Sequence, residues 1–164
     1  MILIALGSNL VSEAYGSPQN ICEAALDALR TRGISVVARS RWFRTAPVPV
    51  SDQPWFVNGV VSVATTLDPA ELLARLHEVE DEFGRTRRVR NEARVLDLDL
   101  IAFDGLVLDG PEPPLLPHPR MHERAFVLLP LADVAPAWHH PRSGAALADL
   151  IAALPADQRA EPMG

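Results

Sequence analysis

Two aspartates stand out in the segment RVLDLDLIAF, residues 94–103, because most of their neighbours are apolar. Side chains alternate along a β-strand, so Asp97 and Asp99 are expected on one face, with Cα atoms roughly 6–7 Å apart. The same alternation places Phe103 on the aspartate face and Ala102 on the opposite one. Two adjacent carboxylates repel each other and are costly to bury, so the pair predicts a positive partner.

That partner is either a divalent cation or a set of arginine side chains. Carboxylate oxygens without histidine or cysteine favour magnesium, which keeps water ligands and recruits substrate phosphates. Two such ions, about 3.5–4 Å apart, would neutralise phosphate charge and orient an in-line displacement. The alternative is an edge strand that shows its polar face to water and pairs with arginines.

The residues before the strand carry the opposite charge. Arg85, Arg87, Arg88, Arg90 and Arg94 cluster in one predicted loop. Guanidinium groups bind phosphates bidentately, so the cluster suits a polyphosphate ligand. The alternative is a solvated run of charges.

Composition excludes several functional classes. The net charge of −6 argues against a general nucleic-acid binder. The chain has no lysine, which excludes a Walker A loop and Schiff-base chemistry. Cys22 is the only cysteine, which excludes an internal disulfide and a multi-thiolate zinc site. With neither a signal-peptide pattern nor an apolar run of about 20 residues, we expect a cytoplasmic protein.

Apolar periodicity predicts an alternation of strands and helices. Strands are expected at 1–7, 34–43, 56–66 and around the aspartates, with a long loop at 44–55. Ser17 and Asp68 are expected to cap helices that end near Gly33 and Phe83. Asp104-Gly105 is typical of a hairpin turn into residues 106–108. The order β-α-β-β-α-β predicts an α+β fold, a ferredoxin-like sandwich.

The remainder is predicted to be a C-terminal extension of the same domain, so residues 1–164 form a single unit. A proline-rich loop starts near residue 110, and helical pieces are expected at 121–131 and 145–154. Residues 155–164 are expected to fray. His139-His140 precedes a proline and is interpreted as an exposed turn, not a metal site.

Six segments of the chain resemble segments of one enzyme family, and they occur in the same order as in that family. They are ALGSNL, FRTAPV, DQPWFVNGVV, HEVEDEFGR, ARVLDLDLIAF and LPHPRMHERAFVLLPLADVAP, and they span residues 4–136. The family is 6-hydroxymethyl-7,8-dihydropterin pyrophosphokinase (HPPK) of folate biosynthesis. The resemblance implies a ferredoxin-like fold, ATP, two magnesium ions and a pterin substrate. It also implies transfer of diphosphate to the pterin's hydroxymethyl oxygen, with release of AMP.

The resemblance also implies roles for individual residues. Asp97 and Asp99 match the metal-bridging aspartates, and Arg85 and Arg94 match arginines that neutralise the transferring phosphates. Asn58 matches the asparagine that reads the pterin edge, between the aromatics Phe56 and Phe126. The pterin-lining loop contributes Thr45 and Val48. Residues implied around ATP are His77, Glu80, Arg88, Leu100, Leu115, His118, His122 and Arg124.

The chain departs from the family pattern at several of these places. The loop that follows Arg85 is one residue shorter than is common, and Asn91-Glu92-Ala93 replaces a tryptophan–glycine–proline triplet. Phe56 stands where many members have tyrosine, which removes a hydroxyl. Pro113 and Pro119 occupy positions that often carry other nucleotide contacts. None of these changes touches the aspartate pair.

Three other functions fit parts of the pattern. A ferredoxin-like regulatory module would bind a small ligand without metals or chemistry. A two-metal hydrolase would share the paired aspartates but need no pterin. An RNA-binding sheet is disfavoured by the single tyrosine and the negative charge. We expect a monomer that binds neither nucleic acid nor membrane.

Overall fold

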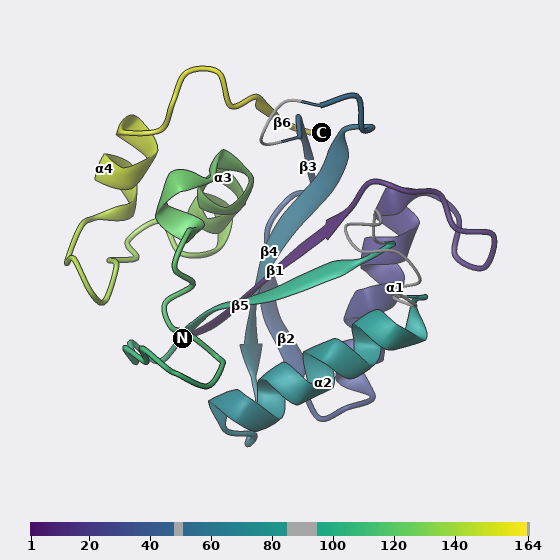
Figure 1. The fold of residues 1–164 in the computed structure, drawn as a ribbon, viewed down its shortest axis with the longest axis horizontal. Coiled ribbons are helices and arrows are strands. Elements are labelled where there is room, and N and C mark those ends of the chain that lie inside the picture. The colour runs from purple at the N-terminus through teal and green to yellow at the C-terminus, as the bar shows by residue number, and fades with distance from the viewer. Residues whose placement is uncertain (48–50, 85–94, 164) are drawn as a thin grey trace.

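The computed structural model describes residues 1–47, 51–84 and 95–163, and Figure 1 shows a central sheet with helices on both sides. Over these ranges the chain forms a mixed α/β fold, as the sequence predicts. Its elements are β1 (Ile2–Ser8), α1 (Pro18–Arg30), β2 (Ser35–Arg39), β3 (Phe43–Thr45), β4 (Phe56–Ala64), α2 (Pro69–Glu82), β5 (Asp97–Phe103), the 3-10 helix η1 (Met121–Glu123), α3 (Ala125–Val134), α4 (Leu147–Ala152) and β6 (Ala160–Pro162).

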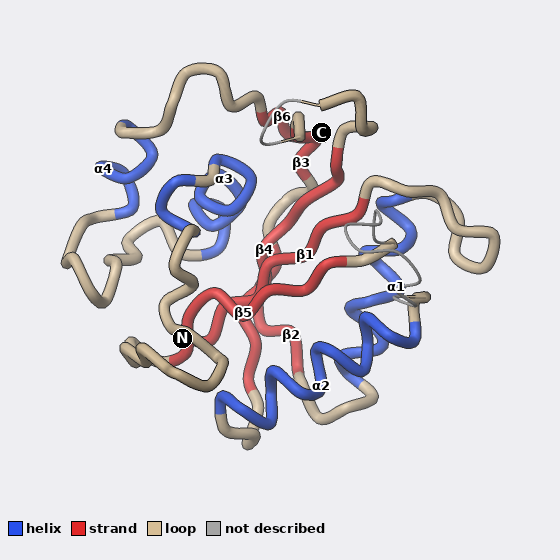
Figure 2. The backbone as a smooth tube through the Cα atoms, viewed as in Figure 1, coloured by secondary structure: helices blue, strands red, loops and turns tan. Residues whose placement is uncertain are grey.

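The strands form one antiparallel sheet in the order β5-β1-β4-β3-β6, and β2 also pairs with β4 (Figure 2). Central strands β1 and β4 are buried along almost their whole length. A strand covered on both faces needs apolar residues at successive positions, which explains the continuous run ILIAL in β1. The assignment of the sheet as ferredoxin-like stays a prediction.

Both predicted helix starts are confirmed. The Ser17 hydroxyl accepts the N–H of Asn20 at 3.2 Å, and Pro18 occupies the first turn of α1. At α2, Asp68 and Glu71 form a reciprocal capping box, with the Glu71 N–H 2.8 Å from Asp68 Oδ1. These caps satisfy backbone donors that the helix itself leaves unpaired.

The strand predicted at 34–43 is divided into β2 and β3. Ser40 lies between them, and its hydroxyl accepts the N–H of Val60 at 2.9 Å, replacing a backbone partner in the ladder. The Trp42 ring then packs over Gly59, where an added Cβ would lie 2.5 Å from the ring. Alternation alone does not show such a break, because both halves keep strand-like residues.

Side-chain alternation in β5 reverses at a bulge. Leu3 of β1 pairs with Ala102, whereas Ile4 pairs with Leu100, so Ile101 is the extra residue. Ala102 therefore packs in the core that contains Leu3, and Phe103 packs in the opposite core. The predicted faces of Ala102 and Phe103 are wrong for this reason, while those of Asp97 and Asp99, before the bulge, are unaffected.

The hairpin predicted after Asp104-Gly105 does not form. Those residues turn, and the Leu106 N–H bonds to the Phe103 carbonyl at 2.9 Å. Residues 106–108 then leave the sheet and meet the proline-rich loop at one bridge, Leu108 with Leu116. A turn signal specifies the reversal of the chain but not the partner of the strand that follows.

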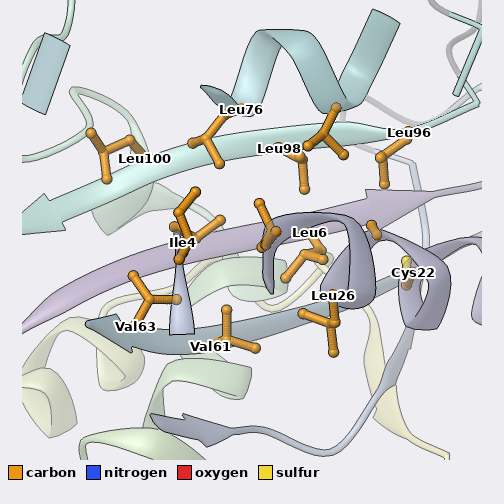
Figure 3. Packing of buried hydrophobic residues seen from close by; sticks show 14 of the residues in the cluster. Ile4, Leu6, Cys22, Leu26, Val61, Val63, Leu76, Leu96, Leu98 and Leu100 are labelled. Carbon is orange, nitrogen blue, oxygen red and sulfur yellow. The ribbon is translucent and has the colours of Figure 1, made fainter. Parts of the chain in front are cut away.

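Each face of the sheet has its own core. Figure 3 shows Ile4, Leu6, Leu98 and Leu100 of the sheet packed with Leu26 of α1 and Leu76 of α2. On the other face, Leu3, Val60 and Ile101 pack with Leu128 and Leu131 of α3. The C-terminal helices thus cover the face that α1 and α2 leave open.

Part of the segment expected to fray, residues 155–164, forms a strand: β6 covers Ala160–Pro162. Strand β6 pairs with β3, with Thr45 opposite Ala160 and Phe43 opposite Pro162. The edge of a sheet presents unpaired backbone groups, and the C-terminal strand satisfies those of β3. Composition gave no sign of this pairing, since residues 155–164 lack an apolar alternation.

Candidate active site

A row of polar residues crosses the sheet on the face opposite α1 and α2. Asp97 and Asp99 of β5 lie opposite Gly7 and Ala5 of β1, and Gly7 lies opposite Asn58 of β4. The antiparallel register brings these residues together from distant parts of the chain. Figure 2 shows their strands, β5, β1 and β4, side by side. A carboxylate pair and a carboxamide therefore share one surface, separated by small residues.

This row lines a cavity of about 180 Å³. Phe56, at the start of β4, and Phe126, in the first turn of α3, both contribute to its wall. Arg124 and Thr45 also line it. The structure thus brings together most of the residues predicted around the pterin, with the aspartate pair beside them.

Asn58 is held in a defined orientation within the cavity. Its Oδ1 accepts a short hydrogen bond from the buried Thr45 hydroxyl, and its Nδ2 donates to the Leu6 carbonyl at 3.4 Å. Gly7 leaves the space this requires, because a Cβ there would lie 2.6 Å from Asn58 Nδ2. The contributions of Gly7 and Ala5 were not predicted, although ALGSNL was among the matching motifs.

A second cavity of about 290 Å³ lies on the α2 side of Asp99. Asp99 lines both cavities, so this residue lies between them. The second cavity combines apolar leucines and prolines with a few polar groups, which is typical of a small-molecule site. Among the residues predicted around ATP, it contains His77, Glu80, Leu100, Leu115 and His118.

Two backbone hydrogen bonds hold His118 in place, one made by its own N–H and one accepted by its ring. Its N–H bonds to the Ile101 carbonyl at 2.9 Å, and its Nδ1 accepts the Arg120 N–H at 3.2 Å. Burial is the main cause that lowers the His118 pKa, the charges of Arg124 and Arg120 add to it, and Asp99 opposes it. A neutral ring then carries its proton on Nε2 and can donate a hydrogen bond from there.

Arg124 supplies a partly buried positive charge beside the acidic pair. Burial lowers its pKa most, Arg120 lowers it further, and Asp99 opposes the shift. A guanidinium group remains protonated despite such a shift. Its carbon lies 5.3 Å from the centre of the Phe126 ring, so the charge is held against one wall of the first cavity.

Glu80 connects α2 to the aspartate strand. Its side chain is only 3 % exposed, and Oε2 accepts the Leu98 N–H at 2.9 Å. This bond fixes β5 between Asp97 and Asp99. Glu80 therefore has a structural contact in addition to lining the second cavity.

Other predicted residues are not brought into these cavities. His122 lies apart from both, and its ring packs edge-on against His140 at 5.9 Å between centroids. His140 is buried, which corrects the exposed turn expected there, while His139 is exposed. Arg85, Arg88, Arg94 and Val48 lie outside the described residues.

The donor set suits magnesium more than a transition metal. Within residues 1–47, 51–84 and 95–163, no three histidine, cysteine or acidic side chains gather as a metal-binding group. Two carboxylates on one strand face are enough for magnesium, which completes its coordination with water and substrate phosphates.

Within residues 1–47, 51–84 and 95–163, no helix is long and apolar enough to cross a membrane.

Comparison with known proteins connects this chain to one enzyme family. The family model described as 7,8-dihydro-6-hydroxymethylpterin-pyrophosphokinase (HPPK) matches residues 3–136. A 2-amino-4-hydroxy-6-hydroxymethyldihydropteridine pyrophosphokinase of Pseudomonas aeruginosa is 43 % identical over 94 % of this chain and 91 % of its own. The Synechocystis protein of the same name is 39 % identical over 91 % of this chain and 73 % of its own.

Solved structures show a similar fold at low sequence identity. The HPPK-DHPS protein of Plasmodium falciparum superimposes with a TM-score of 0.70 at 15 % identity. The match covers 91 % of this chain but 43 % of that one. This chain thus corresponds to only part of that larger protein.

Proposed function

The chain belongs to the 7,8-dihydro-6-hydroxymethylpterin-pyrophosphokinase family, and we propose that its two cavities divide that reaction between them. The reaction transfers diphosphate from ATP to the hydroxymethyl group of 6-hydroxymethyl-7,8-dihydropterin, giving the pterin diphosphate and AMP. The cavity at Asn58 takes the pterin, and the cavity at His77 and His118 takes the nucleotide. The observation that carries this division is Asp99, which lines both cavities.

The first cavity suits a flat heterocycle with hydrogen-bonding edges. Phe56 and Phe126 offer apolar ring surface, and aromatic rings favour stacked or edge-on contacts with other rings. Asn58 offers a donor and an acceptor at the edge of such a ring, in an orientation fixed by Thr45. This arrangement binds the substrate and aims its hydroxymethyl group toward the aspartates.

The nucleotide's phosphates would lie where the two cavities meet. His118 can donate from Nε2 to a phosphate or ribose oxygen, and Arg124 adds a fixed positive charge. Groups held in place before the reaction stabilise developing charge at low reorganisation cost. Most of the rate enhancement in such a site comes from positioning and charge neutralisation.

Asp97 and Asp99 would hold two magnesium ions, which when bound neutralise phosphate charge and orient the reacting phosphate. The roles of Arg85 and Arg94 at the phosphates stay predictions from the resemblance, as does that of Arg88. The ferredoxin-like topology is likewise part of this proposal, supported by the order β5-β1-β4 with β2 beside β4.

The proposal is tested by measuring AMP formation from ATP, magnesium and the hydroxymethyl-dihydropterin. AMP should form only when both magnesium and the pterin are present, and chelation by EDTA should stop it. Asp99→Asn should lower kcat by roughly a hundredfold or more, beyond the loss typical of residues that merely support a metal ligand. Its melting temperature should stay close to that of the wild type.

Asp149→Asn is the matched control, because Asp149 is exposed on α4 and lies in neither cavity. It should keep wild-type kinetics. Calorimetry with a non-hydrolysable ATP analogue, with and without magnesium, separates the enzyme from a binding module. Substantial turnover in Asp99→Asn, or analogue binding that ignores magnesium, would contradict the proposed site.

A further inference from the structure

The C-terminal segment, residues 157–163, contacts both walls of the first cavity. On one wall, β6 pairs with β3, and the Ala46 N–H bonds to the Arg159 carbonyl at 3.0 Å. Thr45 and Ala46 of that wall line the cavity. The Arg159 guanidinium also lies 4.9 Å from the Trp55 ring centre, next to Phe56 in the chain.

On the other wall, Gln158 binds the start of α3 through both ends of its carboxamide. Its Oε1 accepts the Ala125 N–H at 2.8 Å, and its Nε2 donates to the Glu123 carbonyl at 2.7 Å. Ala125 stands between Arg124 and Phe126, and both of these line the first cavity. One side chain thus holds the backbone on either side of Arg124.

Helix α3 depends on this contact for its first backbone donor. Arg124 occupies the N-cap position and makes no side-chain capping bond. The first N–H groups of a helix have no partner within the helix, so they need an acceptor from elsewhere. Gln158 supplies that acceptor from 33 residues further along the chain.

We propose that Gln158 is a positioning residue for the pterin substrate. It sets the place of Arg124 and Phe126 relative to the β3 wall, which the same segment holds through β6. The inference rests on the proposed function, because it assigns the first cavity to the pterin. It goes beyond the family match, which ends at residue 136, whereas Gln158 lies after it.

Steady-state kinetics of Gln158→Leu test this role. Leucine has a similar size but can neither accept the Ala125 N–H nor donate to the Glu123 carbonyl. The pterin KM should rise about fivefold to tenfold, the factor expected from a net loss of about 1 kcal/mol when such hydrogen bonds are removed. The ATP KM should rise less than the pterin KM, because Gln158 does not line the nucleotide cavity and reaches the nucleotide's phosphates only through Arg124.

Two further variants separate positioning from general stability. Gln158→Glu keeps an acceptor for the Ala125 N–H, so its pterin KM should lie between those of the wild type and Gln158→Leu. Gln19→Leu is the matched control, since Gln19 is exposed on α1, and it should leave both KM values unchanged. Pterin affinity measured by calorimetry without nucleotide should follow the same order.

Three results would overturn the inference. They are an unchanged pterin KM in Gln158→Leu, an equal rise in both KM values, and a Gln158→Glu variant no better than the leucine one. If Gln158→Leu does not fold, Gln158→Glu is compared with the wild type alone. Glutamate loses the Nε2 donor to the Glu123 carbonyl, so an unchanged pterin KM in Gln158→Glu would contradict the inference. Wild-type enzyme without pterin-dependent AMP formation would refute the proposed function instead.

Discussion

Asn58 shows how one residue depends on a neighbour that never needs to touch the reacting atoms. Its carboxamide has two ends of similar shape, and only hydrogen bonding decides which end faces which way. The Thr45 hydroxyl donates to Oδ1 and the Leu6 carbonyl accepts from Nδ2, so each end has a distinct partner. The edge that Asn58 would present to the proposed pterin is therefore set by β1 and β3.

Thr45→Val should weaken pterin binding while leaving the nucleotide site unaffected. Valine keeps the shape of threonine but lacks the donor, so Asn58 Oδ1 loses its buried partner, at a cost of about 1–3 kcal/mol. We expect the pterin KM to rise about tenfold and the ATP KM to change little. Steady-state kinetics with each substrate varied in turn measure this difference.

The control for Thr45→Val is Thr65→Val. The Thr65 hydroxyl also donates to a partner, the Gly33 carbonyl at 3.0 Å, but it lies outside both cavities. That variant should lose some stability with unchanged KM values. Equal effects of the two variants on the pterin KM would show that Thr45 does not orient Asn58.

Single residues were predictable where chemistry conflicts with local context. Asp97, Asp99 and Asn58 are polar within apolar strands, and the structure places all three on one cavity. Gly7 and Gln158 gave no such signal, because their importance depends on what approaches them from other elements. His122 matched a family position but packs against His140, which only the tertiary structure reveals.

At the scale of elements, helix ends were predicted better than strand faces. The caps Ser17 and Asp68 act within three residues, so the local sequence contains the whole interaction. The bulge at Ile101 arises between β5 and β1, and the division of β2 from β3 arises against β4. Pairing between distant strands decides these features, and periodicity within one strand does not contain them.

Asp68→Ala should destabilise the protein without changing catalysis. The variant removes the acceptor for the Glu71 N–H at the start of α2, which costs about 1 kcal/mol. A chain of this size should then melt roughly 2–4 °C lower. Helix α2 carries His77 and Glu80 near its other end, so both KM values should stay unchanged.

Thermal unfolding followed by circular dichroism measures the effect of Asp68→Ala. Asp52→Ala serves as the control, because Asp52 is exposed in the loop before β4. It should melt with the wild type. A change in the ATP KM of Asp68→Ala would mean that the first turn of α2 influences the nucleotide cavity.

At the scale of the whole molecule, the sheet is covered on both faces. The predicted β-α-β-β-α-β sandwich includes α1 and α2. Helices were also predicted in the C-terminal extension, but the sequence did not indicate where they pack. The structure places α3 and α4 over the face that carries the polar row, so Phe126 and Arg124 close the first cavity from above the strands. The extension therefore completes the site, and its position could not follow from local patterns.

The same C-terminal layer contains a buried histidine, His140. The residue is 7 % exposed, and its Nδ1 accepts the N–H groups of Arg142 and Ser143 at 3.2 and 3.3 Å. Burial chiefly lowers the His140 pKa, and the charges of His122 and Arg142 lower it further. Protonation would also place a hydrogen on the nitrogen that accepts these bonds.

This shift predicts that the protein loses stability as the solution becomes mildly acidic. With the folded pKa below the unfolded value of about 6.5, the unfolded chain binds more protons between the two values. The contribution of His140 to the free energy of unfolding is therefore present above pH 6.5. It is lost progressively as the pH falls through 6.5 toward the folded pKa, and His118, shifted in the same direction, adds to the loss.

His140→Asn should make this pH dependence shallower, because an asparagine oxygen can accept the same backbone N–H groups but does not titrate. Urea unfolding at several values between pH 5.5 and 7.5 gives the slope for each variant. His139→Asn, which changes the exposed neighbour, should keep the wild-type slope. If His140→Asn leaves the slope of unfolding free energy against pH unchanged, His140 is not the source of the pH dependence.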